Sequence, residues 1–457
     1  MDPRFRAADQ ARSRERGLLG AVVKSILRPL TLLLAVLVLA CTSTPPPTTV
    51  GLPATASAAP LPTVAPTTTP TAISTAASSP APTRSAVPTS SAIPSPTPQG
   101  TPGVIPTAQL SSTLSARLRA VLDGQRTALR VPGMSAAILF PDGSMWTGAT
   151  GQWQITPSRR ATPATPFVAG SITKTFVTAV LMQLAEEGAL SLDDPLENWL
   201  PDYPQADQIT LRMLLSHTSG VFNLFDHPDY TQLVVREGAG KSWTPEEVLD
   251  QLVGEPDFAP GTRYHYSNTG FILLGLVIEA VTGKPIDDVL RDRFFVPLGL
   301  TNTYFQDADA PPPNSARGYL AKGARFKQVS DGTNFRPTES EATVIWAAGS
   351  IVATAADICR WGAALYGGDV VSPDSLTQMT DYAANPYSKG TYGLGTRTRL
   401  FGDQRMFGHT GALRGFNGAM FHLPDLDLTV VVLANRSRLD PNKIVDALLA
   451  VAVPAVQ

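Results

Sequence analysis

A hydroxyl and an amine stand three residues apart in the segment 169–176, at Ser171 and Lys174. Apolar residues with helical spacing follow them at Val177, Val180, Leu181 and Leu184. The spacing predicts one helix face for both side chains, near the N-terminus of the helix. Backbone NH groups and the positive end of the dipole favour an anionic oxygen there, and a buried lysine with a lowered pKa can accept the proton of a serine. These residues indicate nucleophilic catalysis.

The motif alone has a simpler interpretation. A chain of this length contains about one Ser-x-x-Lys by chance, with the serine as an N-cap and the lysine in solvent. Further along, Tyr266 precedes Asn268 by two residues in a loop that enters a helix. A phenol can carry a proton, and an amide can hold a peptide group. A structural loop anchor would look the same.

A third segment, 407–412, contains His409, Thr410 and Gly411 between small residues, and we expect it to be a loop followed by a strand. The glycines would allow a substrate backbone to lie against a strand edge. Taken alone, His409 is more typical of a polar loop residue than of a catalyst. His217, near the end of a helix, is more typical of a packed or capping residue.

Taken in order, Ser171-x-x-Lys174, Tyr266-x-Asn268 and His409-Thr410-Gly411 resemble the three motifs of penicillin-recognising serine hydrolases. The tyrosine form is similar to the branch of class C β-lactamases, D-alanyl-D-alanine carboxypeptidases and related esterases. The resemblance covers nearly the whole body of the chain, including the segments 192–195, 217–220, 273–275, 297–299 and 392–395.

The resemblance implies a role for each matching residue. Ser171 would form an acyl-enzyme while Lys174 and Tyr266 exchange protons, and Asn268 would hold the substrate amide. The backbone NH groups of Ser171 and Ala412 would form the oxyanion hole.

The resemblance also bears on the substrate. Arg397, which follows Gly-Leu-Gly-x, would bind a substrate carboxylate with help from Thr410. Most class C β-lactamases carry lysine in place of His409, which is mostly neutral at pH 7, so peptidase or esterase activity is favoured over β-lactam hydrolysis. The chain has no Gly-x-Ser-x-Gly motif, which argues against an α/β-hydrolase that pairs Ser171 with His409.

The predicted fold is α/β (α+β) and, by the resemblance, β-lactamase/transpeptidase-like. A hairpin at 134–153 with an Asp-Gly turn and a second strand-rich region at 418–434 indicate one antiparallel sheet built from both ends of the domain. Helices would flank the sheet, and a mostly helical lobe would be inserted between its halves.

The N-terminus resembles an export signal. Basic residues precede the 11-residue run Leu30–Ala40, which is too short to span a bilayer. The sequence Val38-Leu39-Ala40-Cys41 resembles a lipobox and predicts lipidation of Cys41; an ordinary signal peptide or an uncleaved anchor are the alternatives. The predicted divisions are a signal segment at 1–41, a Thr/Pro/Ser/Ala-rich linker at 42–107 and a hydrolase domain at 108–457. From its composition we expect the linker to be extended and to act as a tether that holds the domain away from a membrane.

Composition excludes several kinds of protein. The 457 residues are 43% hydrophobic, enough for a large core. The formal net charge is −2, but the cations gather before the domain and leave it acidic, so nucleic acid is not an expected partner. With Cys41 lipidated, Cys359 has no partner, which excludes a disulfide framework and a cysteine zinc site. We expect Cys359 to be packed, and we expect no metal or cofactor.

The predicted function is that of an extracytoplasmic serine hydrolase, anchored to the bacterial membrane as a lipoprotein. Its substrate would be a peptidoglycan peptide, through D,D-carboxypeptidase-like activity, or a small acyl or ester compound. The alternatives are a receptor that is acylated by penicillin or muropeptides with little turnover, and a class C-like β-lactamase. The sequence predicts no oligomeric state.

Overall fold

The computed structural model describes residues 110–457, except 237, 239, 307, 310, 311, 324 and 330–338. The predicted signal segment, Cys41, the linker and the first two residues of the predicted domain lie outside the described residues. They stay predictions.

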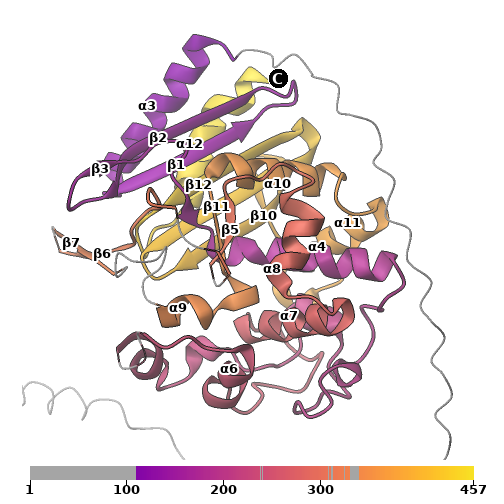
Figure 1. The fold of residues 1–457 in the computed structure, drawn as a ribbon. Helices are drawn as coiled ribbons and strands as arrows, with labels where there is room; N and C mark the ends of the chain where they lie inside the picture. Colours follow the sequence, from indigo (N-terminus) through magenta and orange to yellow (C-terminus); the bar gives the residue numbers. More distant parts are fainter. Residues whose placement is uncertain are drawn as a thin grey trace, which may run out of the picture. The chain divides into compact units, whose positions relative to one another are not determined.

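The main sheet has seven strands in the order β3-β2-β1-β12-β11-β10-β9, and every pairing is antiparallel (Figure 1). The bounds are β1 (Gly133–Leu139), β2 (Met145–Gln154), β3 (Arg159–Arg160), β9 (Arg397–Phe401), β10 (Gln404–Leu413), β11 (Phe416–Leu423) and β12 (Leu428–Ala434). The last strand, β12, lies between β1 and β11. The predicted sheet from both ends of the domain is therefore confirmed.

Both faces of the central strands are buried. In β12, Val430 and Val432 belong to one apolar cluster, and Val431 and Leu433 belong to the other. Apart from the buried Thr429, the strand is thus apolar throughout and shows no polar alternation, as expected when helices cover both faces of a sheet.

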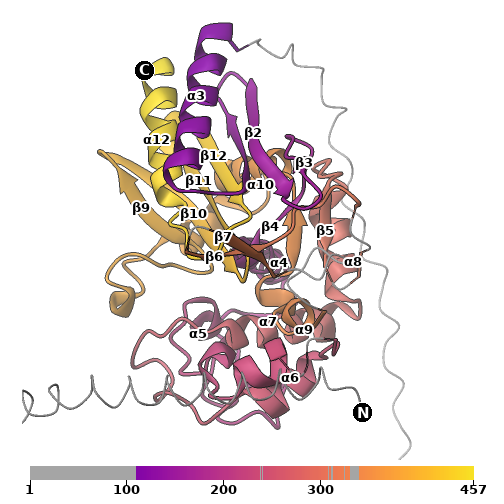
Figure 2. The same ribbon diagram turned by 90° about the vertical axis from the view of Figure 1, so that its left-hand side faces the viewer.

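Helices cover the two faces. On one face, α3 (Ser112–Ala128) and α12 (Asn442–Ala452) contact each other, and they lie side by side in Figures 1 and 2. On the other face, α10 (Ala355–Gly367) packs on β1, β11 and β12. Helix α4 (Thr173–Glu186) also packs on that side, where Phe176 stacks on Trp361 of α10 with ring centres 3.7 Å apart.

A mostly helical lobe lies between the two halves of the sheet in sequence, as predicted. It lies on the side away from α3 and α12 (Figure 2). Its helices are α5 (Leu211–Leu215), α6 (Pro245–Leu252), α7 (Asn268–Thr282), α8 (Ile286–Leu290) and α9 (Glu339–Thr343); α11 (Pro373–Thr380) follows α10. Small strands complete the structure: β4 (Phe167–Val168), β8 (Ile351–Ala353) and β5 (Thr303–Phe305) form one sheet, and β6 (Tyr319–Lys322) pairs with β7 (Arg325–Gln328).

Helix α7 is the most apolar element of the lobe, and its capping explains its bounds. The Ser267 hydroxyl accepts a hydrogen bond from the Gly270 NH at the N-terminus, and Gly283 ends the helix with φ of 66°. Within the described residues no single helix is long and apolar enough to cross a membrane. Among the described helices, α7 and the segment 286–295 reach that length only as a pair, with a bend of 79° between them. Most of α7 is buried in the core, as in the core helix of a folded domain.

Candidate active site

Ser171 lies in a tight turn that leads into α4. The turn, Gly170–Ile172, is a 3-10 helix, and the α-helix begins only at Thr173. The Thr173 hydroxyl donates to the Gly170 carbonyl at 2.8 Å and accepts from the Ile351 NH at 3.0 Å, which ties the turn to β8. The serine is therefore held rigidly at the start of a helix, and its side chain is partly exposed.

Lys174 is fully buried, and its amine has three neighbours. Nζ lies 2.8 Å from Asn268 Oδ1, 2.7 Å from the Ala348 carbonyl oxygen and 3.3 Å from Ser171 Oγ. The first two neighbours can only accept hydrogen bonds. A neutral amine has two N–H bonds and one lone pair, so donation to both oxygens leaves the lone pair for the hydroxyl of Ser171. This is the arrangement that a general base requires.

Electrostatics favour the neutral amine. Burial lowers the pKa of Lys174 well below its ordinary value, and the positive charge of Arg397 lowers it further. No carboxylate is among the causes that shift this pKa.

Tyr266 is the second group beside Ser171. Burial raises the pKa of this phenol, whereas the Ser171 hydroxyl beside it is the largest influence that lowers it. The phenol oxygen is nevertheless buried without a hydrogen bond of acceptable geometry among the described residues. We take the two hydroxyls to be close neighbours whose hydrogen bond is poorly aligned in this structure.

Asn268 connects α7 to the rest of the site. Its side-chain oxygen accepts from Lys174, and its side-chain NH2 donates to Asn223 Oδ1 at 3.1 Å. Asn223 Oδ1 also accepts from the Asn268 backbone NH at 3.0 Å. The orientation of the amide is thereby fixed.

His409 lies inside β10, where the 407–412 segment forms part of the strand. The prediction that 407–412 is a loop is therefore wrong. The pattern was misleading because glycines at 408 and 411 remove the alternation of polar and apolar side chains by which a strand is recognised. His409 Nδ1 lies 2.6 Å from the Thr410 carbonyl oxygen, so this nitrogen carries a proton, and Nε2 is left to accept from the Tyr392 hydroxyl at 3.0 Å. Burial lowers the pKa of the His409 ring well below its ordinary value, and Arg397 and Lys174 lower it further. The ring is therefore neutral.

Gly411 and Ala412 bring β10 against the nucleophile turn. A Cβ atom on Gly411 would lie 1.8 Å from the Ala169 carbonyl oxygen, and one on Gly170 would lie 2.9 Å from the Ala412 nitrogen. Only glycine allows this approach. The strand thus places the Ala412 backbone beside the turn that contains Ser171, while the Ala412 side chain is exposed and Thr410 is partly exposed.

Arg397 enters from the neighbouring strand, where it pairs with Gly408 of β10. Its guanidinium lies over the rings of Tyr266 and Tyr392, 5.4 Å from each ring centre. Its Nε atom is buried without a hydrogen-bond partner in the described part of the chain. Arg397 therefore brings a fixed positive charge and an unused donor to the site.

His217 is packed, as expected from its place near a helix end. It adopts φ of 58°, and its ring lies 4.2 Å from that of Tyr266 and 4.7 Å from that of Tyr392, centre to centre. Its Nδ1 atom accepts from the Ser267 NH at 3.2 Å, which holds the loop that contains Tyr266.

The residues predicted for the three motifs thus lie together, with Arg397 beside them. Sequence reasoning missed Asn223 and the carbonyl of Ala348, both of which contact the motif residues. A backbone carbonyl leaves no signal in residue type, so the Ala348 contact could not have been found. Tyr392 belongs to the 392–395 segment, but its residue type and position in the sequence do not predict its contact with His409.

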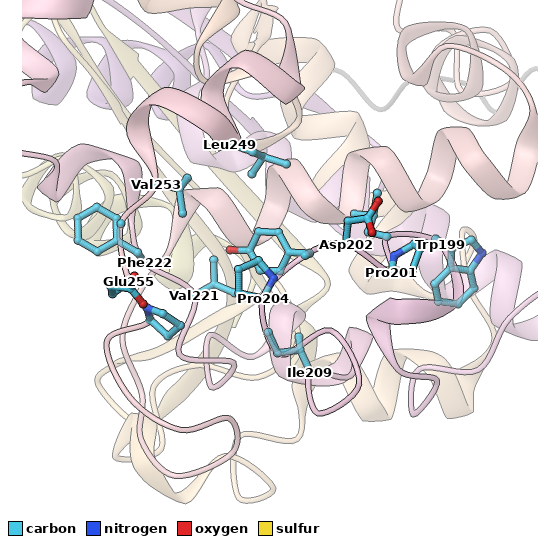
Figure 3. A pocket seen from close by; sticks show the side chains of 14 residues that line it. Trp199, Pro201, Asp202, Pro204, Ile209, Val221, Phe222, Leu249, Val253 and Glu255 are labelled. Carbon is cyan, nitrogen blue, oxygen red and sulfur yellow. The ribbon is translucent and has the colours of Figure 1, made fainter. Parts of the chain in front are cut away.

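The helical lobe contains a hollow of about 550 Å³. Figure 3 shows its lining, which includes Trp199, Phe222, Leu249 and Val253, with Tyr203 also among the lining residues. Burial raises the pKa of the Tyr203 phenol. The lining contains none of the motif residues, so the chemistry belongs to the Ser171 site.

Comparison with known proteins identifies the family. The family model described as "Beta-lactamase" matches residues 70–454. This chain belongs to the beta-lactamase family. The order of the three motifs and the antiparallel sheet flanked by helices agree with this family, as the sequence predicted.

The relatives that the chain resembles carry different functional names. The chain is 31% identical over 275 residues to penicillin-binding protein 4 of Amycolatopsis lactamdurans, covering 57% of this chain and 66% of the relative. It is 28% identical over 322 residues to a D-aminopeptidase of Cereibacter sphaeroides, and the match covers 69% of this chain and 58% of the relative. The chain thus spans about 58 to 66% of these relatives' length.

Solved structures agree in fold. The D-amino acid amidase of Ochrobactrum anthropi SV3 has a TM-score of 0.65 at 27% identity, with 76% of this chain and 100% of the amidase covered. The D-stereospecific amidohydrolase of a Streptomyces species has a TM-score of 0.64 at 29% identity, with 73% and 98% covered. Hydrolases of this family are therefore the chain's structural neighbours.

Proposed function

We propose that this protein is an extracytoplasmic serine hydrolase that forms an acyl-enzyme on Ser171 and acts as a D,D-carboxypeptidase on cell-wall peptides, with ester hydrolysis as a related activity. The observation that carries the proposal is the environment of Lys174. Its buried amine lies within hydrogen-bond distance of two carbonyl oxygens and of Ser171 Oγ, so a neutral amine that donates to both carbonyls has its lone pair left for Ser171.

The acylation step follows from these contacts. Ser171 Oγ attacks the carbonyl carbon of the scissile amide while its proton passes to Lys174 Nζ. The oxyanion that forms is stabilised by the backbone NH groups of Ser171 and Ala412. When the C–N bond breaks, the amine leaves with a proton that Tyr266 relays from the lysine. Water then attacks the acyl-enzyme ester in the same way and gives up its proton to Lys174. The ester bond breaks, the acid is released, and Ser171 Oγ takes back a proton.

Two features bear on the substrate: the neutral His409 favours a peptide over a β-lactam, and Arg397 favours a substrate with a free carboxylate. His409 is neutral, whereas Arg397 carries a fixed charge and an unused Nε donor. Arg397 would bind the carboxylate of the leaving D-amino acid through a charge-assisted hydrogen bond, with Thr410 beside it.

A substitution of Arg397 tests the substrate assignment. Arg397→Ala should lower kcat/KM for a peptide that ends in D-alanyl-D-alanine by about 10- to 100-fold, since a charge-assisted hydrogen bond is lost. The same variant should hydrolyse the C-terminally amidated peptide and a short-chain ester at nearly the wild-type rate. Arg405→Ala, which removes an exposed arginine of β10 that lies over Tyr382, is the control. Equal losses on all substrates would give Arg397 a structural role.

A second candidate activity is hydrolysis of D-amino acid amides. It is favoured by the match to the D-amino acid amidase over that protein's whole length. D-phenylalanine amide has no carboxylate for Arg397, so its turnover in wild type and in Arg397→Ala should be equal if this activity is the true one.

Turnover also distinguishes an enzyme from a receptor. A pulse of fluorescent penicillin followed by a chase should show label that leaves Ser171 if the acyl-enzyme is hydrolysed. Label that persists for hours would indicate a receptor that is acylated once. For location, we propose a lipid anchor at Cys41 and the 42–107 segment as a tether.

A further inference from the structure

A hollow of about 730 Å³ begins at Ala412, the residue whose backbone lies beside the nucleophile turn. Its lining comes from the helical lobe, from the β6–β7 hairpin, from the turn between β10 and β11 and from the segment that follows β12. Beyond Ala412 it continues along Leu413 and Arg414, away from Arg397, which pairs with Gly408 earlier in β10. A substrate whose leaving group lies at Arg397 would therefore extend its acyl part into this hollow.

The charges that line the hollow are unbalanced. Four cations converge on it from separate segments: Arg236, Lys327, Arg414 and Arg438. Among the described residues of the lining Glu341 is the one acidic side chain, and it forms an ion pair of 3.0 Å with Arg414.

The other three cations are available to a ligand. Arg236, Lys327 and Arg438 are exposed, and none has an ion-pair or hydrogen-bond partner among the described residues. Three like charges around one hollow repel one another unless an anion lies between them. They stand out because the domain as a whole is acidic.

The remaining lining is partly aromatic. Phe225 and Tyr230 lie edge to face with ring centres 4.9 Å apart, and Phe225 is 36% exposed. Rings of this kind can cover the methylene groups of a chain, while the cations reach a charged end.

We infer that this hollow is an acyl-side subsite for substrates whose acyl part carries a carboxylate. The inference rests on the proposed function, because that function places the leaving group at Arg397. An acyl chain several bonds long would lie against Phe225 and Tyr230, and its carboxylate would meet Arg236, Lys327 and Arg438. The subsite selects substrates by charge and takes no part in the chemical step.

The test compares two substrates that differ only in that charge. Both are N-acylated D-alanyl-D-alanine peptides; one carries a glutaryl group, and the other carries its monomethyl ester. Wild-type enzyme should have about 10-fold higher kcat/KM for the glutaryl peptide at low salt. The preference should shrink as salt is raised, because exposed charges are screened.

The triple variant Arg236→Gln, Lys327→Gln, Arg438→Asn should lose the preference and keep the rate on the methyl ester within about 2-fold. Asparagine is chosen for Arg438 because that residue has φ of 55°, which asparagine tolerates. Arg325→Gln removes an exposed cation from the same strand as Lys327 but outside the hollow, so it should keep the preference. Circular dichroism melting of each variant shows whether the fold is kept.

Equal rates on the two peptides in the wild type, or a preference that survives in the triple variant, would overturn the inference while the peptidase function stands. If neither peptide is hydrolysed, the proposed function fails. The subsite is then tested separately, by measuring how well each peptide protects Ser171 from labelling by a neutral fluorophosphonate. Stronger protection by the glutaryl peptide than by its methyl ester supports the subsite. Equal protection overturns it.

Discussion

At the scale of single residues, the site depends on keeping one amine without its proton. Lys174 has a pKa well below its ordinary value of 10.5, mainly through burial and then through Arg397. In the unfolded chain the lysine keeps its ordinary pKa. At any pH between the folded and the unfolded pKa, the unfolded chain therefore binds more protons than the folded one. Stability therefore rises with pH across that window, and the amine becomes a base as pH rises through the lower value.

We predict that kcat/KM for a neutral ester rises with pH and reaches a plateau once Lys174 is neutral. Arg397→Gln should move this acidic limb to higher pH, because the variant removes a positive charge that lowers the pKa of the lysine. Burial also lowers the pKa values of the nearby His217 and His409 well below the ordinary histidine value, so both rings are neutral at pH 7. A pH–rate profile of both enzymes is the measurement, and an unmoved limb would contradict the role of Lys174.

The Tyr266 phenol is predicted to relay a proton. Tyr266→Phe should slow acylation by roughly 10²- to 10⁴-fold, as expected for loss of a proton carrier. The melting temperature should change little, because the hydroxyl makes no well-aligned hydrogen bond in the described structure. Stopped-flow acylation by a chromogenic ester measures the effect. The neighbouring Tyr264→Phe is the control and should acylate normally; a Tyr266→Phe enzyme that does the same would rule out the relay.

At the scale of elements, the nucleophile turn and β10 are positioned by backbone contact. Gly411→Ala would place a methyl group 1.8 Å from the Ala169 carbonyl oxygen, so the turn or the strand must move. We predict a loss of about 10²-fold or more in kcat/KM, since a displacement near 1 Å is enough for that. Gly124→Ala in α3, where the added methyl group meets nothing within 4 Å, should leave activity unchanged. Steady-state kinetics compare the two, and normal activity in Gly411→Ala would show that the approach is not needed.

The same elements show what sequence can and cannot predict. The paired hairpins and α7 follow from apolar patterning and capping residues, which are local. The chemistry of Ser171, Lys174, Tyr266 and Asn268 follows from residue type and spacing. Contacts made by backbone groups, such as the Ala348 carbonyl on Lys174, depend on how distant segments pack. The strand character of 407–412 was hidden because glycine has no side chain to show an alternation.

At the scale of the whole molecule, the predicted anchor gives a direct test. Cys41→Ala should release the protein from the membrane fraction and leave its specific activity unchanged, because Cys41 lies far before the domain in sequence. Cys359→Ala is the matched control: this cysteine is buried in α10, as the sequence predicted, and its loss should not alter fractionation. Immunoblots of membrane and soluble fractions decide the matter, and an unchanged distribution in Cys41→Ala would refute lipidation there.

The position of β12 at the centre of the sheet also has a consequence for how the protein is made. Strand β1 ends at Leu139, but its partner begins only at Leu428, so a ribosome needs roughly 15 to 60 s between them at ordinary rates of synthesis. Until then β1 has β2 as its only neighbour in the sheet, and a lone hairpin is marginally stable. The seven-stranded sheet therefore cannot be completed until the chain is almost fully made, which suits the export through a translocation channel that we propose for this protein.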